Sequence, residues 1–405
     1  MRIAEINMTA SGSTGRIMLQ IAELAKGKNM MVQTFSTRTF ARKPEAVRKI
    51  ENHLYYGSFF ENTIHTVLGK ITGYNGCFSY FGTRDLVRKL EKMKPDVLHL
   101  HNLHQFCIHM PTLFRYIKKN NVRVIWTLHD CWTFTGHCPH FTVAQCNKWK
   151  TRCYACSQYK KYPKTYVDQS KNMYAKKKKW FLGVKDMTLV TPSEWLANLV
   201  RQSFLKDYPV KVIHNGIDLS IFKPTVSDFR ERYHCEQKKI LLGVSFGWGY
   251  SKGLDVFVEL AKRLDDSYQI VLVGTNEGTS QMLPKNVISI HRTENQEQLA
   301  EIYTAADLFI NPTREDTYPT VNMEALACGT PVLTFNTGGS PEIISNACGS
   351  VVACDDMDAL EKEVKRICED KPYSEESCLE RASRFDMNEK YEEYTLLYEN
   401  STYST

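Results

Sequence analysis

The sequence contains no long apolar run. No stretch approaches the roughly 20 apolar residues that a membrane-spanning helix needs, and the first residues, MRIAEINM, lack the basic segment, apolar stretch and cleavage site of a secretory signal. We therefore expect a cytoplasmic protein. Of its 405 residues, 42% are hydrophobic and 24% are charged, a composition typical of a globular protein long enough for two separate cores.

The sequence also lacks the cysteine pattern of a disulfide-stabilised scaffold. Its 13 cysteines are an odd number, and a chain of 405 residues does not depend on disulfides to build a core. We expect reduced thiols, some of which bind a metal ion.

Two groupings on which many enzymes depend are missing as well. No clear nucleophile–base pair is present, and no Asp-x-Asp pair follows a predicted strand, where it would bind a catalytic metal ion. Asp356 and Asp358 have that spacing, but they stand at a predicted helix start and are interpreted as capping residues. We expect no cofactor for catalysis.

Charge is distributed unevenly along the chain. Residues 1–200 carry 31 Lys and Arg against 12 Asp and Glu, a balance of +19, whereas residues 201–405 carry 21 against 33, a balance of −12. The difference supports two domains. A basic half suggests an anionic partner such as a membrane surface, a lipid phosphate or nucleic acid, and a solvated lysine-rich surface is the alternative.

Short apolar runs alternate with amphipathic segments along the chain, which predicts parallel sheets with helices on both faces. Strands are expected at 3–8, 31–36, 96–100, 122–128, 187–191, 211–215, 239–246, 269–274, 287–291, 307–312 and 331–335. Helices are expected at 16–26, 83–93, 111–119, 168–182, 193–203, 253–264, 295–305, 319–328 and 356–368.

This alternation predicts an α/β protein with two doubly wound domains. The first covers residues 1–204, with a cysteine-rich insertion near 131–165, and the second covers 205–385, so the boundary falls near 204–209. A final helical segment within 386–405 has no strand after it and is expected to dock on the first domain. In such domains, ligands bind outside the carboxyl ends of the strands, so residues that directly follow strands carry most weight.

The segment that follows one of these strands, residues 311–343, is the most informative. Its loop holds Arg314, Glu315 and Asp316, and a helix is predicted to begin near Pro319. Free N–H groups at a helix start favour an anion such as a diphosphate. Carboxylates of the loop can accept hydrogen bonds from sugar hydroxyls, and Glu324 can bind a ribose diol. The alternative is an ordinary loop with solvated acidic side chains.

The stretch from Arg314 to Pro331 resembles the signature of glycosyltransferase family 4, a large retaining family with the GT-B fold. The resemblance implies two Rossmann-like domains that face each other across a cleft and a nucleotide-sugar donor, a UDP- or GDP-sugar. It is closest to the capsule and exopolysaccharide branch, whose relatives act on saccharide or lipid-diphosphate-linked acceptors at the inner membrane face. The residues in register are Glu324, Ala325, Ala327, Gly329, Pro331 and Val332.

The resemblance also assigns roles to single residues. His129, Glu315 and Lys252 are the expected catalytic residues, and His101 is expected on the acceptor side. Glu315 lies nine residues before Glu324, whereas the family spacing is usually eight, so Asp316 remains the alternative contact to the donor sugar. Donor binding is expected from Ser13, Thr14, Gly15, Arg16, Arg314, Asp316, Tyr318, Pro319, Thr320 and Glu324.

One family residue is absent from the loop that contains Lys252. The family usually has an arginine where this chain has Phe246 or Gly247, and Arg314 is a candidate substitute. In this family the acceptor hydroxyl attacks from the leaving-group side, and the donor phosphate takes its proton. The enzyme then supplies positioning and charge stabilisation, which agrees with the missing nucleophile–base pair.

A cysteine cluster lies in the predicted insertion. Its four thiols, at Cys138, Cys146, Cys153 and Cys156, fall within 19 residues and end in a Cys-x-x-Cys pair. They predict a structural zinc that orders an insertion with little apolar content, and reduced, partly buried thiols are the alternative.

A basic segment, residues 169–185, places clustered lysines beside Trp180, Phe181 and Leu182. It predicts a helix that lies on an anionic membrane surface with its aromatic side chains inserted, and hence peripheral attachment. A solvated lysine run on a core helix is the alternative.

The whole chain also has alternative interpretations: a catalytically silent relative, a nucleotide-sugar epimerase or hydrolase, or a zinc-containing nucleic-acid-binding protein. The family resemblance itself implies no nucleic acid partner.

Overall fold

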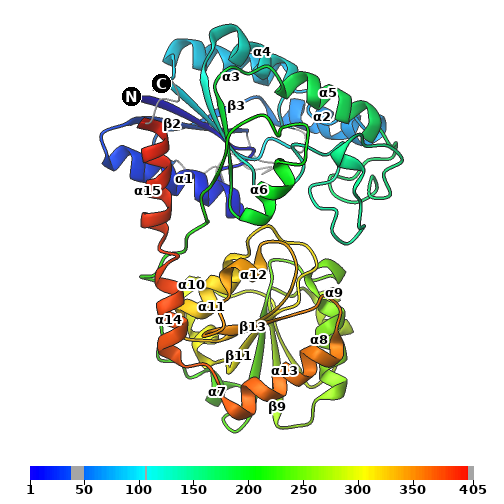
Figure 1. Ribbon diagram of the computed structural model, residues 1–405, viewed down its shortest axis with the longest axis vertical. Coiled ribbons are helices and arrows are strands. Elements are labelled where there is room, and N and C mark those ends of the chain that lie inside the picture. The colour runs from blue at the N-terminus through cyan, green and yellow to red at the C-terminus, as the bar shows by residue number, and fades with distance from the viewer. Residues whose placement is uncertain (38–49, 105–106, 400–405) are drawn as a thin grey trace. The chain divides into compact units, whose positions relative to one another are not determined.

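The computed structural model describes residues 1–37, 50–104 and 107–399. The chain divides into two compact units (Figure 1): unit 1 comprises residues 1–213 together with the chain from 391 onward, and unit 2 comprises residues 214–390. None of the helices within the described ranges is both long and apolar enough to cross a bilayer.

Unit 1 is built on a seven-stranded sheet with the order β3-β2-β1-β4-β5-β6-β7, in which all neighbours pair in parallel. Its central strands β1, β4, β5 and β6 are almost entirely buried, as expected for a parallel sheet covered by helices. The strands are β1 (Arg2–Ile6), β2 (Met31–Thr37), β3 (His53–Tyr56), β4 (Val97–Leu100), β5 (Arg123–Thr127), β6 (Met187–Thr191) and β7 (Val210–Val212). The helices are α1 (Gly12–Gly27), α2 (Phe59–Thr72), α3 (Tyr80–Met93), α4 (Met110–Asn120), α5 (Ser170–Phe181), α6 (Glu194–Val200) and most of α15 (Met387–Glu399).

Unit 2 has a six-stranded parallel sheet with the order β10-β9-β8-β11-β12-β13. Its strands are β8 (Lys239–Val244), β9 (Tyr268–Val273), β10 (Val287–Ile290), β11 (Leu308–Asn311), β12 (Val332–Phe335) and β13 (Gly349–Val352). Its helices are α7 (Phe229–Arg232), α8 (Leu254–Arg263), α9 (Glu277–Met282), α10 (Gln296–Ala305), α11 (Thr320–Ala327), α12 (Ser340–Ile343), α13 (Met357–Asp370) and α14 (Glu375–Ser383).

The predicted fold class is confirmed, since both sheets are parallel and carry helices. One strand lies elsewhere than expected: β7, expected to open the second domain, pairs with β6 and completes the first sheet. Unit 1 therefore extends to Ile213 rather than to residue 204. The Ser193 hydroxyl caps α6 by accepting from the Leu196 amide at 3.2 Å, and Asp356 caps α13 by accepting from the Ala359 amide at 3.0 Å.

Helix α15 packs on unit 1 through its carboxyl-terminal turns. The Arg123 guanidinium donates to the carbonyls of Leu397 and Tyr398, both at 2.8 Å, and the Tyr398 hydroxyl lies 2.7 Å from Nδ1 of His99. Residues 400–405, which complete the predicted terminal segment, lie outside the described residues.

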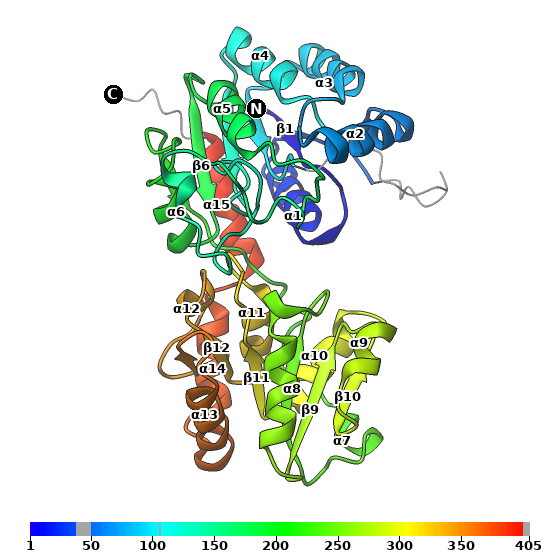
Figure 2. The same cartoon turned by 90° about the vertical axis from the view of Figure 1, so that its right-hand side faces the viewer.

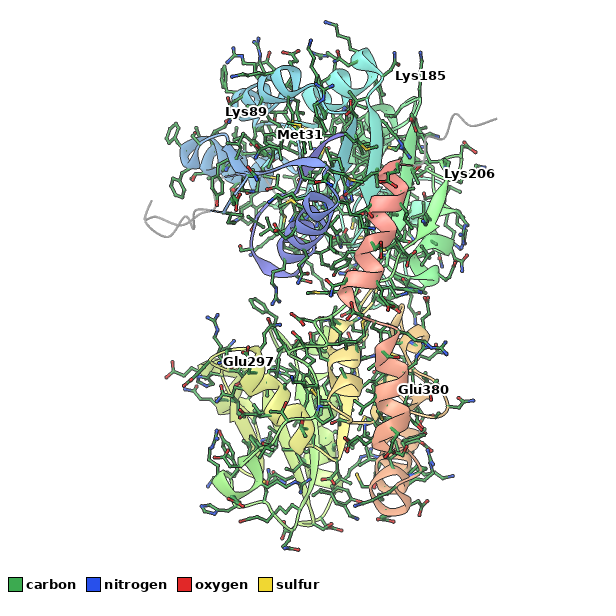
Figure 3. All side chains as sticks on the ribbon, turned by 90° about the vertical axis from the view of Figure 1, so that its left-hand side faces the viewer. Met31, Lys89, Lys185, Lys206, Glu297 and Glu380 are labelled. Carbon is green, nitrogen blue, oxygen red and sulfur yellow. The ribbon has the colours of Figure 1, made fainter. Side chains whose placement is uncertain are left out.

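The charge asymmetry of the sequence follows the two units. Figure 3 labels Lys89, Lys185 and Lys206 on unit 1 and Glu297 and Glu380 on unit 2. Unit 1 contains residues 1–200, whose balance is +19, and unit 2 contains most of residues 201–405, whose balance is −12, so the two units carry net charges of opposite sign.

Candidate active site

Two loops of unit 2, one with Lys252 and one with Arg314, Glu315 and Asp316, follow neighbouring central strands. Strands β8 and β11 pair in parallel, and the strand order reverses between them, which is where doubly wound sheets bind ligands. The loop after β11 packs against the loop after β8: the Arg314 amide donates to the Ser251 carbonyl at 2.8 Å. Gly253, at a φ of +73°, leaves no room for a side chain, because a Cβ there would lie 2.5 Å from the Pro312 carbonyl oxygen.

Lys252 pairs with Asp316 in this site. Its ammonium group donates to Oδ2 of Asp316 at 2.6 Å and to the Glu315 carbonyl at 3.3 Å. The other Asp316 oxygen, Oδ1, accepts from the Tyr318 amide at 3.2 Å. Gly338, at a φ of +60°, passes so close that a Cβ would lie 1.8 Å from the Asp316 carbonyl oxygen. The position of Asp316 is thus fixed by several contacts, while the Glu315 side chain is half-buried beside it.

Arg314 is already occupied by protein groups. Nε donates to Asp355 at 2.7 Å, Nη1 and Nη2 donate to the two carboxylate oxygens of Asp255 at 2.8 Å each, and the guanidinium carbon lies 3.8 Å from the ring centre of Tyr250. The side chain is 7% exposed. Burial opposes the charged form, but the hydrogen bonds to the two aspartates dominate and raise the Arg314 pKa. These contacts hold the loops after β8 and β11 together, and the diphosphate contact expected of Arg314 stays a prediction.

Helix α11 begins directly after this loop. Pro319 is the N-cap in an extended conformation, and Thr320 is the first helical residue, so the first amide groups of α11 face the loop that carries Asp316. The ring of Tyr318 is buried and stacks on His214 with centroids 4.8 Å apart. Further along α11, a carboxylate oxygen of Glu324 accepts from the Tyr303 hydroxyl at 3.1 Å, which orients the glutamate side chain.

The glycine-rich segment of unit 1 forms the first turn of α1, after β1. Ser13 and Arg16 are exposed, and the Thr14 hydroxyl accepts from the Asn7 side-chain amide at 3.1 Å. Gly15 is required by packing, because a Cβ there would lie 2.7 Å from the Ala10 carbonyl carbon. The start of α1 is thereby held close to the end of β1.

Two histidines predicted for the site meet at the same edge of the first sheet. His101 follows β4 and His129 follows β5, and these strands are neighbours. Nδ1 of His101 lies 3.1 Å from Nε2 of His129, and the rings are stacked. His101 is fully buried, whereas His129 is partly exposed.

The sequence prediction missed a carboxylate behind these histidines. Glu5 lies fully buried in β1, with Oε2 3.6 Å from Nε2 of His101 and Oε1 accepting from the Tyr398 hydroxyl at 3.1 Å. A glutamate within the otherwise apolar strand IAEI was the available signal, since charged residues in central strands are rarely buried without a partner. Glu5, His101 and His129 form a row from the core to the strand ends.

This row is uncharged near neutral pH. Burial raises the pKa of Glu5 to about 8 and lowers the pKa of both His101 and His129 to about 3. The two histidines therefore act as neutral hydrogen-bonding groups. They suit contacts with hydroxyl groups better than contacts with phosphate.

Among the described residues, Glu5, His99 and His101 form a group whose potential metal-ligand atoms all lie within 4.8 Å. Both ring nitrogens of His99 already have hydroxyl partners, Tyr398 at 2.7 Å and Thr127 at 2.8 Å. We interpret this group as a hydrogen-bond network that joins α15 to the sheet.

The four insertion cysteines are brought together. The thiols of Cys138 and Cys156 are hydrogen-bonded, which is the main cause that lowers the pKa of Cys156 to about 7. Cys153 lies near both of them and near Cys146, and its sulfur accepts from the Gly136 amide at 3.2 Å. Within the described residues these thiols do not form a group as tight as 4.8 Å, whereas zinc would hold its sulfurs about 3.8 Å apart.

The insertion is more apolar than expected. It contributes Trp132, Phe134 and Trp149 to the core of unit 1, each at most 2% exposed. Packing of these aromatic side chains, and not the thiols alone, orders a segment with little regular secondary structure.

The basic helix α5 differs from the sequence prediction. Lys177 is fully buried, donates to the carbonyls of Trp132 at 2.6 Å and Thr135 at 3.0 Å, and lies over the Trp132 ring. Phe181 is also fully buried, while Trp180 is partly buried. Phe181 therefore packs in the core instead of inserting into a membrane, whereas Trp180 and Leu182 are partly exposed, so the membrane contact expected of this helix stays a prediction.

Comparisons with known proteins agree with this geometry. Residues 35–221 match the model described as Glycosyltransferase Family 4, and residues 228–385 match the one described as Glycosyl transferases group 1. The chain is 26% identical over 267 residues to a putative colanic acid biosynthesis glycosyl transferase, WcaC, of Escherichia coli K12, covering 64% of each chain. It is 28% identical over 161 residues to an N,N'-diacetylbacillosaminyl-diphospho-undecaprenol alpha-1,3-N-acetylgalactosaminyltransferase of Campylobacter jejuni, covering 37% of this chain and 43% of that protein.

Solved structures share the fold. Sucrose-phosphate synthase from Thermosynechococcus elongatus has a TM-score of 0.74 at 19% identity, with 98% of both chains covered. Anabaena HepE in complex with UDP and glucose has a TM-score of 0.67 at 13% identity, with 98% of this chain and 99% of that chain covered. Similarities at such low identity establish the architecture of two parallel-sheet domains.

Proposed function

Because the chain belongs to the glycosyltransferases that combine a Family 4 part with a group 1 part, we propose that it transfers a sugar from a nucleotide-sugar donor to a saccharide acceptor, with retention of anomeric configuration. The observation that carries this proposal is the arrangement at the switch point of unit 2. There Lys252, Asp316 and the start of α11 converge, with Glu324 further along the same helix.

This arrangement suits a nucleoside diphosphate. Lys252 and the free amides at the start of α11 offer positive charge to the diphosphate, which becomes more negative as the bond to the sugar breaks. Glu324 offers a carboxylate to the ribose hydroxyls. Of the two loop carboxylates, Glu315 remains our choice for the donor sugar, since Asp316 is bound by Lys252 and the Tyr318 amide.

The acceptor side is proposed for unit 1. The neutral row of Glu5, His101 and His129 ends at the strand edge, where His129 can accept or donate a hydrogen bond to a sugar hydroxyl. The donor phosphate takes the proton of the attacking hydroxyl, so the protein supplies positioning and no covalent nucleophile.

The donor and acceptor classes follow from the relatives. The HepE structure contains UDP, which favours a UDP-sugar, with a GDP-sugar as the second choice. The names of the Escherichia coli and Campylobacter relatives point to cell-surface polysaccharide synthesis on a lipid-diphosphate-linked acceptor, and hence to attachment at the inner membrane face.

A thermal-shift screen with UDP, GDP and their sugar conjugates tests donor binding. We expect one nucleotide to raise the melting temperature, and Glu324→Ala to abolish the shift. Glu301→Ala, which changes a partly exposed glutamate of α10, is the matched control and should keep it. No response to any nucleotide would instead favour a catalytically silent relative, since the guanidinium of Arg314, the candidate substitute for the missing arginine, is bonded to Asp255 and Asp355.

We also propose that Cys138, Cys146, Cys153 and Cys156 bind a structural zinc ion. The support is their clustering, with buried Lys177 close enough to offset part of the negative charge of a zinc–thiolate group. Elemental analysis should find about one zinc per chain, lost in Cys138→Ser/Cys156→Ser and kept in Cys354→Ser, which changes an exposed thiol of unit 2. Zinc well below one per chain in the unmutated protein would contradict this proposal.

A further inference from the structure

Helix α2 has its apolar and polar faces reversed. Its buried residues are Asn62, His65 and Gly69, whereas large apolar side chains point to solvent. A surface helix of a globular protein normally directs its apolar stripe to the core. The outward-facing residues are Phe59, Phe60, Ile64, Val67, Leu68 and Ile71, which we call the α2 apolar face.

The exposure of this face is large and contiguous. Phe60 is 73% exposed and Ile71 is 55% exposed, although they lie at opposite ends of the helix. The positions recur at helical spacing, so they form one stripe along a helix about 21 Å long. The inward face makes a polar contact, since Nδ1 of His65 lies 2.6 Å from the Ser79 hydroxyl. This contact favours the orientation in which the polar side of α2 faces the protein.

The apolar surface continues beyond the start of α2. The Glu61 carboxylate accepts from the amides of Phe81 at 2.8 Å and Gly82 at 2.8 Å, which holds the first turn of α3 beside it. Phe81 is 77% exposed there. In Figure 2, α2 lies at the periphery of unit 1 with α3 next to it. These amide contacts also occupy the single acidic side chain of α2.

Cations border this surface at both ends. Near α3, the Arg84 guanidinium lies 5.8 Å from the ring centre of Tyr80. At the other end, Lys70 stands in the last turn of α2, and the Lys176 ammonium lies 5.3 Å from the ring centre of Tyr74. An apolar stripe bordered by lysine and arginine is the pattern of a helix that lies in the interface of an anionic bilayer.

We propose that the α2 apolar face, together with Phe81, is the surface by which the protein inserts into a membrane of anionic phospholipids. This surface exposes more apolar side chain than α5, whose Phe181 packs in the core and whose Trp180 is partly buried. The charge pattern selects lipid over a second copy of the chain, because a symmetric dimer through this face would set its cations against one another. The α2 apolar face would give the proposed transferase its contact with the membrane. This role depends on the proposed function, because a lipid-linked acceptor is the reason for the protein to bind a membrane.

Vesicle flotation tests the proposal on the full-length protein. We expect binding to vesicles of phosphatidylcholine mixed with phosphatidylglycerol and weak binding to phosphatidylcholine alone. The variant Phe60→Ser/Ile64→Ser/Ile71→Ser should bind at least tenfold more weakly, and Lys70→Ala/Lys176→Ala about fivefold more weakly for each cation removed. Met282→Ser, which removes a 71% exposed side chain of α9, is the matched control and should bind as the unmutated protein does.

Two further readouts keep the result interpretable. The melting temperature of the triple variant should not fall, because the removed side chains are exposed, and Phe60→Ser alone serves if the triple variant fails to fold. The nucleotide-induced thermal shift should persist in the triple variant, so loss of vesicle binding is distinct from failure of the proposed transferase. Unchanged vesicle binding by these variants would overturn the proposal. So would a dimer of the unmutated protein that dissociates in the triple variant while no vesicles are bound.

Discussion

The two sheets share a strand order, but the side chains at their switch points differ in charge. In unit 1 the order β3-β2-β1-β4-β5-β6 places buried, uncharged histidines and a protonated glutamate at the switch point. This uncharged row ends at His129, next to the charged Asp130, which lies 2.7 Å from Nε2 of His104. In unit 2 the matching order β10-β9-β8-β11-β12-β13 places ion pairs there, with Lys252 on Asp316 and Arg314 between two aspartates. The same topology thus brings polar side chains together at the switch point of each sheet, while their charge differs between the two units.

The largest effect should come from removing the cation of unit 2. Lys252→Ala removes the positive charge beside the α11 start, and we expect the transfer rate to fall about 10²- to 10³-fold because a preorganised charge-stabilising donor is lost. The rate is measured with saturating donor, to separate turnover from binding. Lys285→Ala, on an exposed lysine of the same unit, should leave the rate unchanged. An unchanged rate for Lys252→Ala would mean that Lys252 does not stabilise the negative charge of the departing diphosphate.

A smaller effect, on stability, should follow from Arg314. Arg314→Ala leaves Asp255 and Asp355 without their partner, and we expect the free energy of unfolding to fall by about 2 kcal/mol, less than for a fully buried pair because both aspartates are about half exposed. Urea unfolding measures it. Arg263→Ala, whose ion pairs are at the surface, should leave the transition almost unchanged. If the Arg314→Ala protein is as stable as the unmutated protein but no longer binds nucleotide, Arg314 contacts the donor directly.

The third test concerns the uncharged row of Glu5, His101 and His129 in unit 1. Burial raises the pKa of Glu5 from 4.5 to about 8, so between these values the folded protein holds a proton that the unfolded chain releases. Stability should therefore fall as pH rises from about 4.5 through 8, by at most about 1.4 kcal/mol per pH unit. Glu5→Gln should flatten this dependence in melting curves recorded across that range.

The control for this experiment is Glu23→Gln, on the exposed side of α1, which should keep the pH dependence of the unmutated protein. A Glu5→Gln protein with the same pH dependence as the unmutated protein would contradict the uncharged row in unit 1. The difference in charge between the row in unit 1 and the ion pairs in unit 2 would then not hold.

The alternation of apolar runs and amphipathic segments was sufficient to predict both sheets, because buried parallel strands are locally apolar. It missed two strands, β3 and β13, and five helices, α2, α7, α9, α12 and α14. Helix α2 was missed because its polar face is inward and its apolar face outward, so its pattern does not match a core helix. Strand β13, GSVV, is short and begins at a glycine.

In unit 2 the sequence predicted which side chains the fold brings together, and in unit 1 it did so only in part; the roles of these residues stay predictions. Lys252, Glu315 and Asp316 lie in loops that follow the neighbouring strands β8 and β11, and Glu324 lies on the helix after the second loop. The burial of Lys177, the clamp on Arg314 and the row behind His101 depend on residues far apart in the chain, such as Glu5 and Tyr398. Such tertiary contacts cannot be deduced from local pattern.

The most direct test of the central claim is a transfer assay with the nucleotide sugar selected by the thermal-shift screen and a lipid-diphosphate-linked saccharide acceptor. The anomeric configuration of the product is determined by nuclear magnetic resonance. We expect transfer of one sugar with the configuration of the donor, abolished or strongly reduced in Lys252→Ala. A product of inverted configuration, or transfer that is unaffected by Lys252→Ala, would contradict the account.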